Sequence, residues 1–80
     1  MDTKQRLRQF LVEELHVQPK QVATDESPLI SNHVIDSLGL SQIVSFLEDE
    51  FELLVADEEI VKENFETIDA ITRLVESKRA

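Results

Sequence analysis

The triplet Asp36-Ser37-Leu38 places a primary alcohol at the start of a segment with a helical pattern. The first backbone N–H groups of a helix have no partner inside the helix, and the helix dipole favours negative charge there. A phosphate esterified to a serine at this point would be held by the helix itself. Aspartate and serine are also preferred helix caps, so the triplet taken alone favours a purely structural role.

Gly39 follows this triplet and is the only glycine in the chain. A glycine inside a helix costs up to about 1 kcal/mol relative to alanine, and less in the first turn. We interpret this glycine as leaving room for the surface of another protein near Ser37. Leu38 would add an apolar anchor beside the hydroxyl, and Asp36 an acid.

An enzyme is the alternative reading of the same region, because His33, Asp36 and Ser37 are the residue types of a nucleophilic triad. His33 lies only four residues before Ser37, in a loop without an evident orienting partner. The chain is also too short to frame a substrate pocket around these groups. We therefore expect no catalytic residue.

A metal site is not expected either. His16 and His33 are far apart in sequence and lack ligand spacing, and there is no cysteine. The acidic run at 48–52 points in several directions around a helix, so we interpret it as a solvated face.

Helical patterns set the elements that must position Ser37. The first is predicted over Thr3–His16, where Asp2 and Gln5 resemble a capping box. The second begins at Ser37 or Leu38, and its apolar residues recur at helical spacing. These residues are Leu40, Ile43, Val44, Leu47 and Phe51.

Two further helices are predicted after residue 56. A short one spans Glu58–Glu63 with Asp57 as its cap, and Asn64 and Phe65 form a turn. The last spans Ile68–Lys78 and is capped by Thr67. The predicted fold is all-α: a small four-helix bundle with three main helices and one short helix, forming a single domain over residues 1–80.

A long loop over Val17–Asp36 joins the first two helices, pinned to the core by scattered apolar residues. A loop of this length in a small domain is often functional. Phe46 lies off the apolar stripe of the second helix, and two roles are open to it. It either packs beneath this loop or helps to cover a bound acyl chain.

Composition excludes several classes of function. Seventeen acidic and eight basic residues give a net charge of −9, and no Lys or Arg occurs from Gln21 through Val61. Such a surface repels nucleic acid and anionic membranes, and it attracts basic proteins. The N-terminus is too charged for a signal peptide, and no apolar run is long enough to cross a membrane. We expect a cytoplasmic monomer.

The whole pattern resembles the phosphopantetheine-binding carrier proteins, the acyl and peptidyl carriers of fatty-acid, polyketide and nonribosomal-peptide synthesis. The resemblance rests on the triplet at 36–38 followed by FLEDEF at 46–51, DEEI at 57–60 and ENFETIDAI at 63–71, and it covers most of the chain. It implies that Ser37 carries a 4′-phosphopantetheine arm, transferred from coenzyme A by a phosphopantetheinyl transferase. The thiol of the arm would hold an acyl or aminoacyl group as a thioester, and the protein itself would not be an enzyme.

The same resemblance implies the partners. An adenylating ligase or an acyltransferase would load the arm, and downstream acyl-accepting enzymes would unload it. The residues expected to be recognised by these partners are Asp36, Leu38, Gly39, Gln42, Ser45, Glu48 and Asp49.

The chain departs from the fatty-acid type at two positions. Carriers of that type usually have acids directly after the triplet and again three residues later, where this chain has Gly39 and Gln42. The combination of IDSLGL at 35–40 with ENFETIDAI at 63–71 resembles free-standing carriers instead, which implies a role in polyketide, nonribosomal-peptide or related specialised biosynthesis. The alternatives are a housekeeping fatty-acid carrier and an unmodified interaction module of the same fold.

Overall fold

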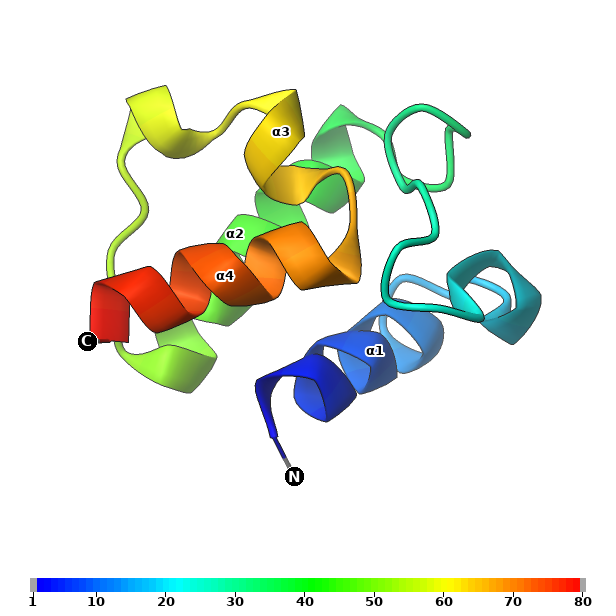
Figure 1. Ribbon diagram of the computed structural model, residues 1–80, viewed down its shortest axis with the longest axis horizontal. Helices are drawn as coiled ribbons and strands as arrows, with labels where there is room; N and C mark the ends of the chain where they lie inside the picture. Colours follow the sequence, from blue (N-terminus) through cyan, green and yellow to red (C-terminus); the bar gives the residue numbers. More distant parts are fainter. Residues whose placement is uncertain (1, 80) are drawn as a thin grey trace.

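A computed structural model describes residues 2–79 of the chain. Within this range every regular element is a helix, and the order of elements is visible in Figure 1. The elements are α1 (Thr3–Glu13), the 3₁₀ turn η1 (Pro19–Val22), α2 (Ser37–Phe51), the 3₁₀ turn η2 (Asp57–Glu59), α3 (Lys62–Phe65) and α4 (Ile68–Arg79). The predicted all-α fold, with three main helices and one short helix, is confirmed.

The beginning of α1 is set by the expected capping box. The Asp2 carboxylate accepts a hydrogen bond from the Gln5 N–H at 2.9 Å, and the Asp2 N–H donates to the Gln5 side chain at 2.9 Å. The helix ends at Glu13, whereas the sequence predicted an end at His16. His16 has a left-handed φ of 59°, and the Val17 N–H donates to the Leu11 carbonyl, so the chain has already turned away.

The predicted position of the short helix, over Glu58–Glu63, is wrong. The structure has η2 up to Glu59, an extended Val61, and then α3, so Asn64 and Phe65 are helical and not a turn. The cause is the side chain of Phe65, which is fully buried and draws the helical turn towards the core. The Asn64 amide donates to the Glu59 carbonyl and joins the two turns.

The bounds of the last helix agree closely with those predicted from the sequence. The Thr67 hydroxyl accepts a hydrogen bond from the Ala70 N–H at 2.9 Å, as expected for a cap. The helix extends to Arg79, one residue beyond the predicted end. No helix between residues 2 and 79 is both long enough and apolar enough to cross a membrane.

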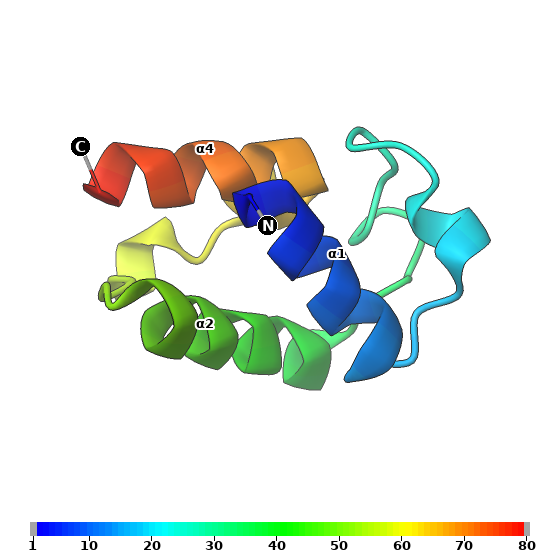
Figure 2. The ribbon, with the colours of Figure 1, turned by 90° about the horizontal axis from the view of Figure 1, so that it is seen from below.

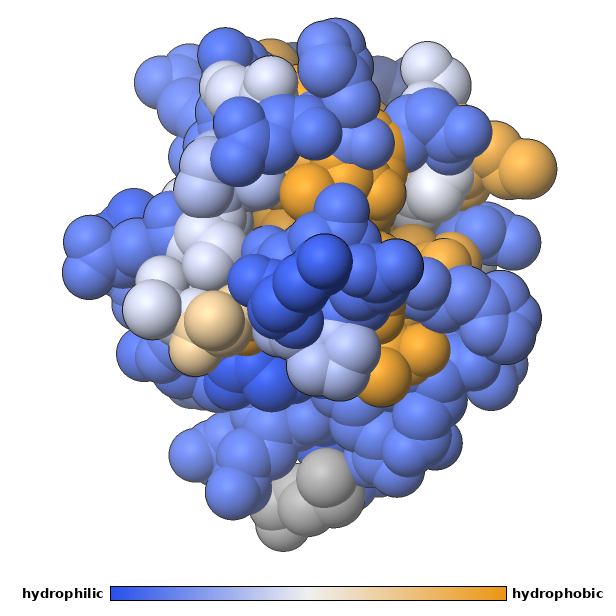
Figure 3. Space-filling model, turned by 90° about the vertical axis from the view of Figure 1, so that its right-hand side faces the viewer, coloured by the Kyte–Doolittle hydropathy of each residue, from blue (hydrophilic) through white to orange (hydrophobic). Residues whose placement is uncertain are grey.

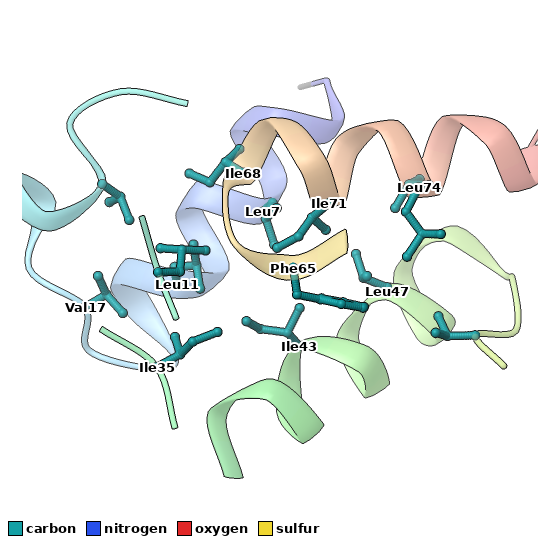
Figure 4. Close-up of a cluster of buried hydrophobic side chains, with 14 residues drawn as sticks. Leu7, Leu11, Val17, Ile35, Ile43, Leu47, Phe65, Ile68, Ile71 and Leu74 are labelled. Carbon is teal, nitrogen blue, oxygen red and sulfur yellow. The ribbon is translucent and has the colours of Figure 1, made fainter. Parts of the chain in front are cut away.

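The core lies between the three long helices and is closed by α3. Figure 4 shows Phe65 between Ile43 and Leu47 of α2 and Ile71 of α4. Each of these four side chains is 0% exposed. Burying a large apolar side chain contributes about 1.5–3 kcal/mol, so this cluster fixes α2 relative to the rest of the chain.

The loop before α2 is fastened to the helices by polar contacts. The Glu66 carboxylate accepts hydrogen bonds from the Ile30 N–H, the Ser31 N–H and the Ser31 hydroxyl at 2.8, 2.9 and 2.5 Å. Asp25, earlier in the loop, forms ion pairs with Lys4 at 3.3 Å and Arg8 at 2.7 Å. The segment that leads into Ser37 is therefore held at both of its ends.

Candidate functional site

Ser37 is the first residue of α2 and is exposed. Asp36 caps this helix: its carboxylate accepts a hydrogen bond from the Gly39 N–H at 2.8 Å, and its carbonyl accepts one from the Leu40 N–H. The N–H groups of Ser37 and Leu38 donate no hydrogen bond to any residue of the described range. The serine hydroxyl thus lies beside two free donors at the positive end of the helix dipole.

The loop residues before Asp36 determine where α2 begins. The N–H groups of Val34 and Ile35 both donate to the Leu29 carbonyl, at 2.8 and 3.2 Å. Leu29 and Ile35 are buried, and His33 between them turns the chain with a φ of 55°. The position of the Ser37 hydroxyl therefore depends on packing within the loop as well as on the cap.

Gly39 does not open the surface as the sequence suggested. It is buried, and a Cβ atom at this position would lie 3.4 Å from the Ile35 Cβ and 3.4 Å from the Asp36 carboxylate. Its missing side chain therefore faces the chain's own loop. A direct contact of Gly39 with a partner stays a prediction.

The residues predicted to be recognised by partners do not all line the same hollow. Gln42, Ser45 and Asp49 line a hollow between α2 and α1. The Glu48 carboxylate instead accepts a hydrogen bond from the Val55 N–H at 3.0 Å, and lines a different hollow near the end of α2. Glu48 therefore holds the chain after α2, and it does not line the hollow that the other three line.

Apolar exposure is strongest beside Ser37 and after α2. Leu38 is 68% exposed and Leu54 is 81% exposed, while Val61 is 38% exposed. Figure 3 views the molecule from the side of the 23–36 loop and shows apolar residues lying open among hydrophilic ones. Leu38 is thus available as the apolar anchor that the sequence predicted.

A nucleophilic triad is not assembled around Ser37. The Asp36 carboxylate binds the Gly39 N–H, and no side-chain hydrogen bond of His33 occurs in the part of the chain described. Nor do any three carboxylates or imidazoles among residues 2–79 gather closely enough to hold a metal ion.

The anchors of the loop were not foreseen from the sequence. Hydrogen bonds from the Ser31 hydroxyl and N–H and from the Ile30 N–H lower the pKa of Glu66 to about 2. The Arg8 guanidinium likewise holds the pKa of Asp25 below its usual value, with Lys4 adding to the effect. Both carboxylates contact residues far away in sequence, so no local pattern could have identified them.

Phe46 packs against α1 and not beneath the loop. Its ring stacks on Phe10 with centroids 4.3 Å apart and planes at 17°, and it meets Phe51 edge-on at 6.1 Å. The signal in the sequence was its position off the apolar stripe. Its partner on α1 could not be read from that position.

The sequence that carries this exposed serine is similar to known proteins. Residues 5–75 match the family model described as phosphopantetheine attachment site. The chain is also 30% identical over 73 residues to the acyl carrier protein of Wolinella succinogenes, covering 91% of this chain and 92% of that protein. The chain belongs to the family of phosphopantetheine-binding carrier proteins.

Within that family it is an acyl carrier protein, a non-catalytic protein that holds acyl groups on a covalently attached 4′-phosphopantetheine group. The helical bundle of the structure is the one expected for this class. Its role requires a phosphopantetheinyl transferase to attach the group and acyl-handling enzymes to use it.

Proposed function

We propose that Ser37 is the attachment residue and that the protein is a free-standing carrier of specialised biosynthesis. The observation that supports the attachment site best is the exposed hydroxyl of Ser37 at the capped start of α2, beside two free N–H groups. Attachment forms a P–O bond between the serine oxygen and the phosphorus of the phosphopantetheine group, breaks the P–O bond of the pyrophosphate bridge in coenzyme A, and releases adenosine 3′,5′-bisphosphate. The serine proton leaves in the same step.

The surroundings of Ser37 fit a phosphodiester. Its negative charge would face the free N–H groups of Ser37 and Leu38, an arrangement in which a helix start stabilises an anion. The first turn of α2 contains no acidic residue that would repel it. The Asp36 carboxylate is occupied by the Gly39 N–H, so its charge is partly compensated.

When bound, the group supplies a thiol that forms thioesters with acyl or aminoacyl cargo. The residues of this chain then present the arm. Asp36 fixes the start of the helix, and the exposed Leu38 offers an apolar contact that the transferase and later partners can bury. Gln42, Ser45 and Asp49 extend this surface along α2, and the Glu48 carboxylate is engaged by the Val55 N–H.

The assignment to polyketide, nonribosomal-peptide or related pathways is supported by the neutral start of α2. Gly39, Ser41, Gln42 and Ser45 carry no charge, and the first exposed acid on this side is Asp49. Long-range attraction of basic partners would therefore act far from Ser37, and short-range contacts would decide recognition near it. A housekeeping fatty-acid role is the alternative, favoured by the likeness to the Wolinella acyl carrier protein.

Intact-mass spectrometry tests the attachment site. The protein is incubated with coenzyme A, Mg²⁺ and a broad-specificity phosphopantetheinyl transferase, alongside Ser37→Ala and the matched control Ser41→Ala, which alters an exposed serine of the same helix. We expect the mass of one phosphopantetheinyl group on the wild type and the control only. Modification of Ser37→Ala would overturn the proposal.

The pathway is tested with the loaded arm. The modified protein is offered adenylating ligases with amino acids, and separately the malonyl transferase and the condensing enzyme of a fatty-acid synthase. We expect acylation by a ligase or a specialised acyltransferase and slow use by the fatty-acid enzymes. Efficient use by the fatty-acid enzymes would support the housekeeping role instead.

A further inference from the structure

Phe65 and Glu66 are neighbours in the chain, and they hold two different parts of the region around Ser37. The Phe65 side chain is fully buried and lies between Ile43 and Leu47 of α2, as Figure 4 shows. The Glu66 side chain instead contacts the loop that leads into α2. The junction between α3 and α4 therefore holds both the helix that begins at Ser37 and the segment before it.

Glu66 binds this loop through its backbone as well as its side chain. Its carbonyl accepts a hydrogen bond from the Leu29 N–H at 2.7 Å. One carboxylate oxygen accepts from the N–H groups of Ile30 and Ser31, and the other accepts from the Ser31 hydroxyl. Figure 2 shows the loop at the end of the molecule where both α2 and α4 begin. One residue thus holds three successive residues of the loop.

The contacts continue from the loop to the cap of α2. The Leu29 carbonyl accepts hydrogen bonds from the N–H groups of Val34 and Ile35, at 2.8 and 3.2 Å. The Ile35 side chain is buried and lies against Gly39, whose N–H is bound by the Asp36 carboxylate. A series of direct contacts therefore leads from the α3–α4 junction to the residue before Ser37. Residues 29–35 are called the entry segment below.

The other polar anchor of the loop does not reach the entry segment. Asp25 pairs with Lys4 and Arg8 of α1, and its carbonyl accepts a hydrogen bond from the Asp69 N–H. Among residues 2–79, Glu66 is the one residue outside the entry segment whose side chain forms a hydrogen bond with it. The two anchors can therefore be tested against each other.

The Glu66 carboxylate is charged at any pH suited to the modification reaction. Hydrogen bonds from Ser31 and Ile30 lower its pKa to about 2, and Lys62 lies 3.6 Å from one oxygen. Hydrogen bonds to an ionised acceptor are shorter and stronger than those between neutral groups. Both oxygens already accept hydrogen bonds from the entry segment, so the charge acts mainly on the chain itself.

We propose that Glu66 is a positioning residue for attachment of the phosphopantetheine arm, because it fixes the entry segment and thereby orients the Ser37 hydroxyl. The proposal rests on the proposed function, since it takes Ser37 as the attachment residue. Phosphoryl transfer requires the attacking oxygen to lie in line with the bond that breaks. Glu66 acts through the loop and need not touch the transferase or coenzyme A.

Transferase kinetics of Glu66→Ala and Glu66→Gln test the proposal. Alanine removes all three hydrogen bonds of the side chain. Glutamine keeps an oxygen for the two N–H groups and gains an amide that can donate to the Ser31 hydroxyl, but it has no charge. A misplacement of about 1 Å can cost as much as about 100-fold in rate, so we expect kcat to fall about tenfold in Glu66→Ala. KM for the carrier should change little, and Glu66→Gln should recover most of the lost kcat.

Two kinetic outcomes would overturn the proposal. An unchanged kcat in Glu66→Ala is one of them. The other is an equal loss in Glu66→Gln, which would mean that another protein recognises the negative charge. Glu63→Ala is the matched control, because Glu63 is an exposed acid of α3 without an ion pair or side-chain hydrogen bond in the part of the chain described. We expect its kcat to equal that of the wild type.

Amide hydrogen exchange of the unmodified protein separates positioning from general stability. The N–H groups of Ile35 and Gly39 report on the entry segment and the cap, and the N–H of Val75 in α4 reports on global unfolding. In Glu66→Ala we expect exchange at the first two to rise by a larger factor than at Val75. In Asp25→Ala we expect no such excess. The same factor at all three amides of Glu66→Ala would show a purely global effect and would overturn the proposal.

A milder variant keeps the test decisive if Glu66→Ala does not fold. Ser31→Ala alters an exposed position and removes only the hydrogen bond from the hydroxyl to Glu66. We expect a smaller loss of kcat than in Glu66→Ala, together with faster exchange of the Gly39 N–H. Wild-type values of both quantities in Ser31→Ala would contradict the proposal.

The failure of this inference is distinguishable from failure of the proposed function. Intact-mass spectrometry shows first whether the transferase modifies the wild type and spares Ser37→Ala. Modification at Ser37 without a loss of kcat in Glu66→Ala overturns the positioning role alone. Modification that persists in Ser37→Ala, or a wild type that an active transferase does not modify, overturns the attachment site and this inference with it.

Discussion

Replacing Gly39 with alanine is expected to stabilise the protein. Gly39 is the third residue of α2, and no described glycine has a positive φ. The added Cβ would lie 3.4 Å from the Ile35 Cβ and the Asp36 carboxylate, and 3.8 Å from the Ile35 Cγ2, which are ordinary contact distances. Neither the backbone conformation nor the available space therefore requires glycine.

The magnitude follows from the entropy of the unfolded chain. Alanine in place of glycine at a compatible position stabilises a protein by about 0.4–1 kcal/mol. We expect about 0.5 kcal/mol, because the position lies in the first helical turn, where the propensity difference is smaller. A change of 1 kcal/mol moves Tm by about 4–8 °C in a domain of this size, so Tm should rise by about 2–4 °C.

Thermal and urea unfolding of the unmodified protein, followed by circular dichroism, measure this change. Ser41→Ala changes an exposed position of the same helix, so its effect on Tm measures the contribution of helix propensity without a change in packing. A fall in Tm for Gly39→Ala would refute the reasoning, since it would mean that the contact with Ile35 cannot accommodate a methyl group. The rate of modification by the transferase adds a second readout. A marked slowing in the stabilised variant would show that partners need the glycine after all.

Three further predictions concern the cap, the loop anchor and the net charge. Asp36→Ala should lose about 1 kcal/mol and about 4–8 °C in Tm, whereas Asp36→Asn should lose much less; equal losses would contradict the cap. Because the folded state lowers the pKa of Glu66 from 4.5 to about 2, its contribution to stability is complete above about pH 4.5 and is lost as the pH falls towards 2. Glu66→Gln should therefore flatten the pH dependence of Tm in that range, and an unchanged slope would exclude this anchor. The net charge of −9 predicts that Tm rises with added NaCl, and a Tm independent of ionic strength would contradict self-repulsion.

The starts of the helices could be predicted from the sequence because they depend on local contacts. Asp2 with Gln5, Asp36 with Gly39, and Thr67 with Ala70 are each three residues apart, and each makes the hydrogen bond that its residue type favours. The same local pattern predicted Ser37 as the candidate site. Its exposure at the helix start then follows directly from the cap.

The ends of the helices and the position of α3 depend on tertiary contacts. The chain turns away after α1 at His16 and after α2 at Glu52. Both residues have a left-handed backbone conformation, although neither is a glycine. α3 is displaced because Phe65 has to enter the core, and the hydrophobic pattern alone does not give the depth of a residue. The role of Glu48 in holding the chain after α2 has the same origin, since its carboxylate accepts a hydrogen bond from the Val55 N–H.

The loop anchor and the contact of Phe46 with α1 could not be predicted for a similar reason. Glu66 contacts Ser31 from 35 residues away, and Phe46 meets Phe10 on another helix. Periodicity identified Phe46 as unusual but contained no information on its partner. Such pairs are decided by how the helices pack, and they become visible only in the structure.

The position of the phosphopantetheine group tests the central claim most directly. The modified protein can be digested after glutamate, which gives the peptide 27–48 with its five serines, and the group can be located by fragment-ion mass spectrometry. The account predicts that the whole added mass lies on Ser37. Its presence on Ser27, Ser31, Ser41 or Ser45, or its absence with a transferase that modifies another carrier, would contradict it.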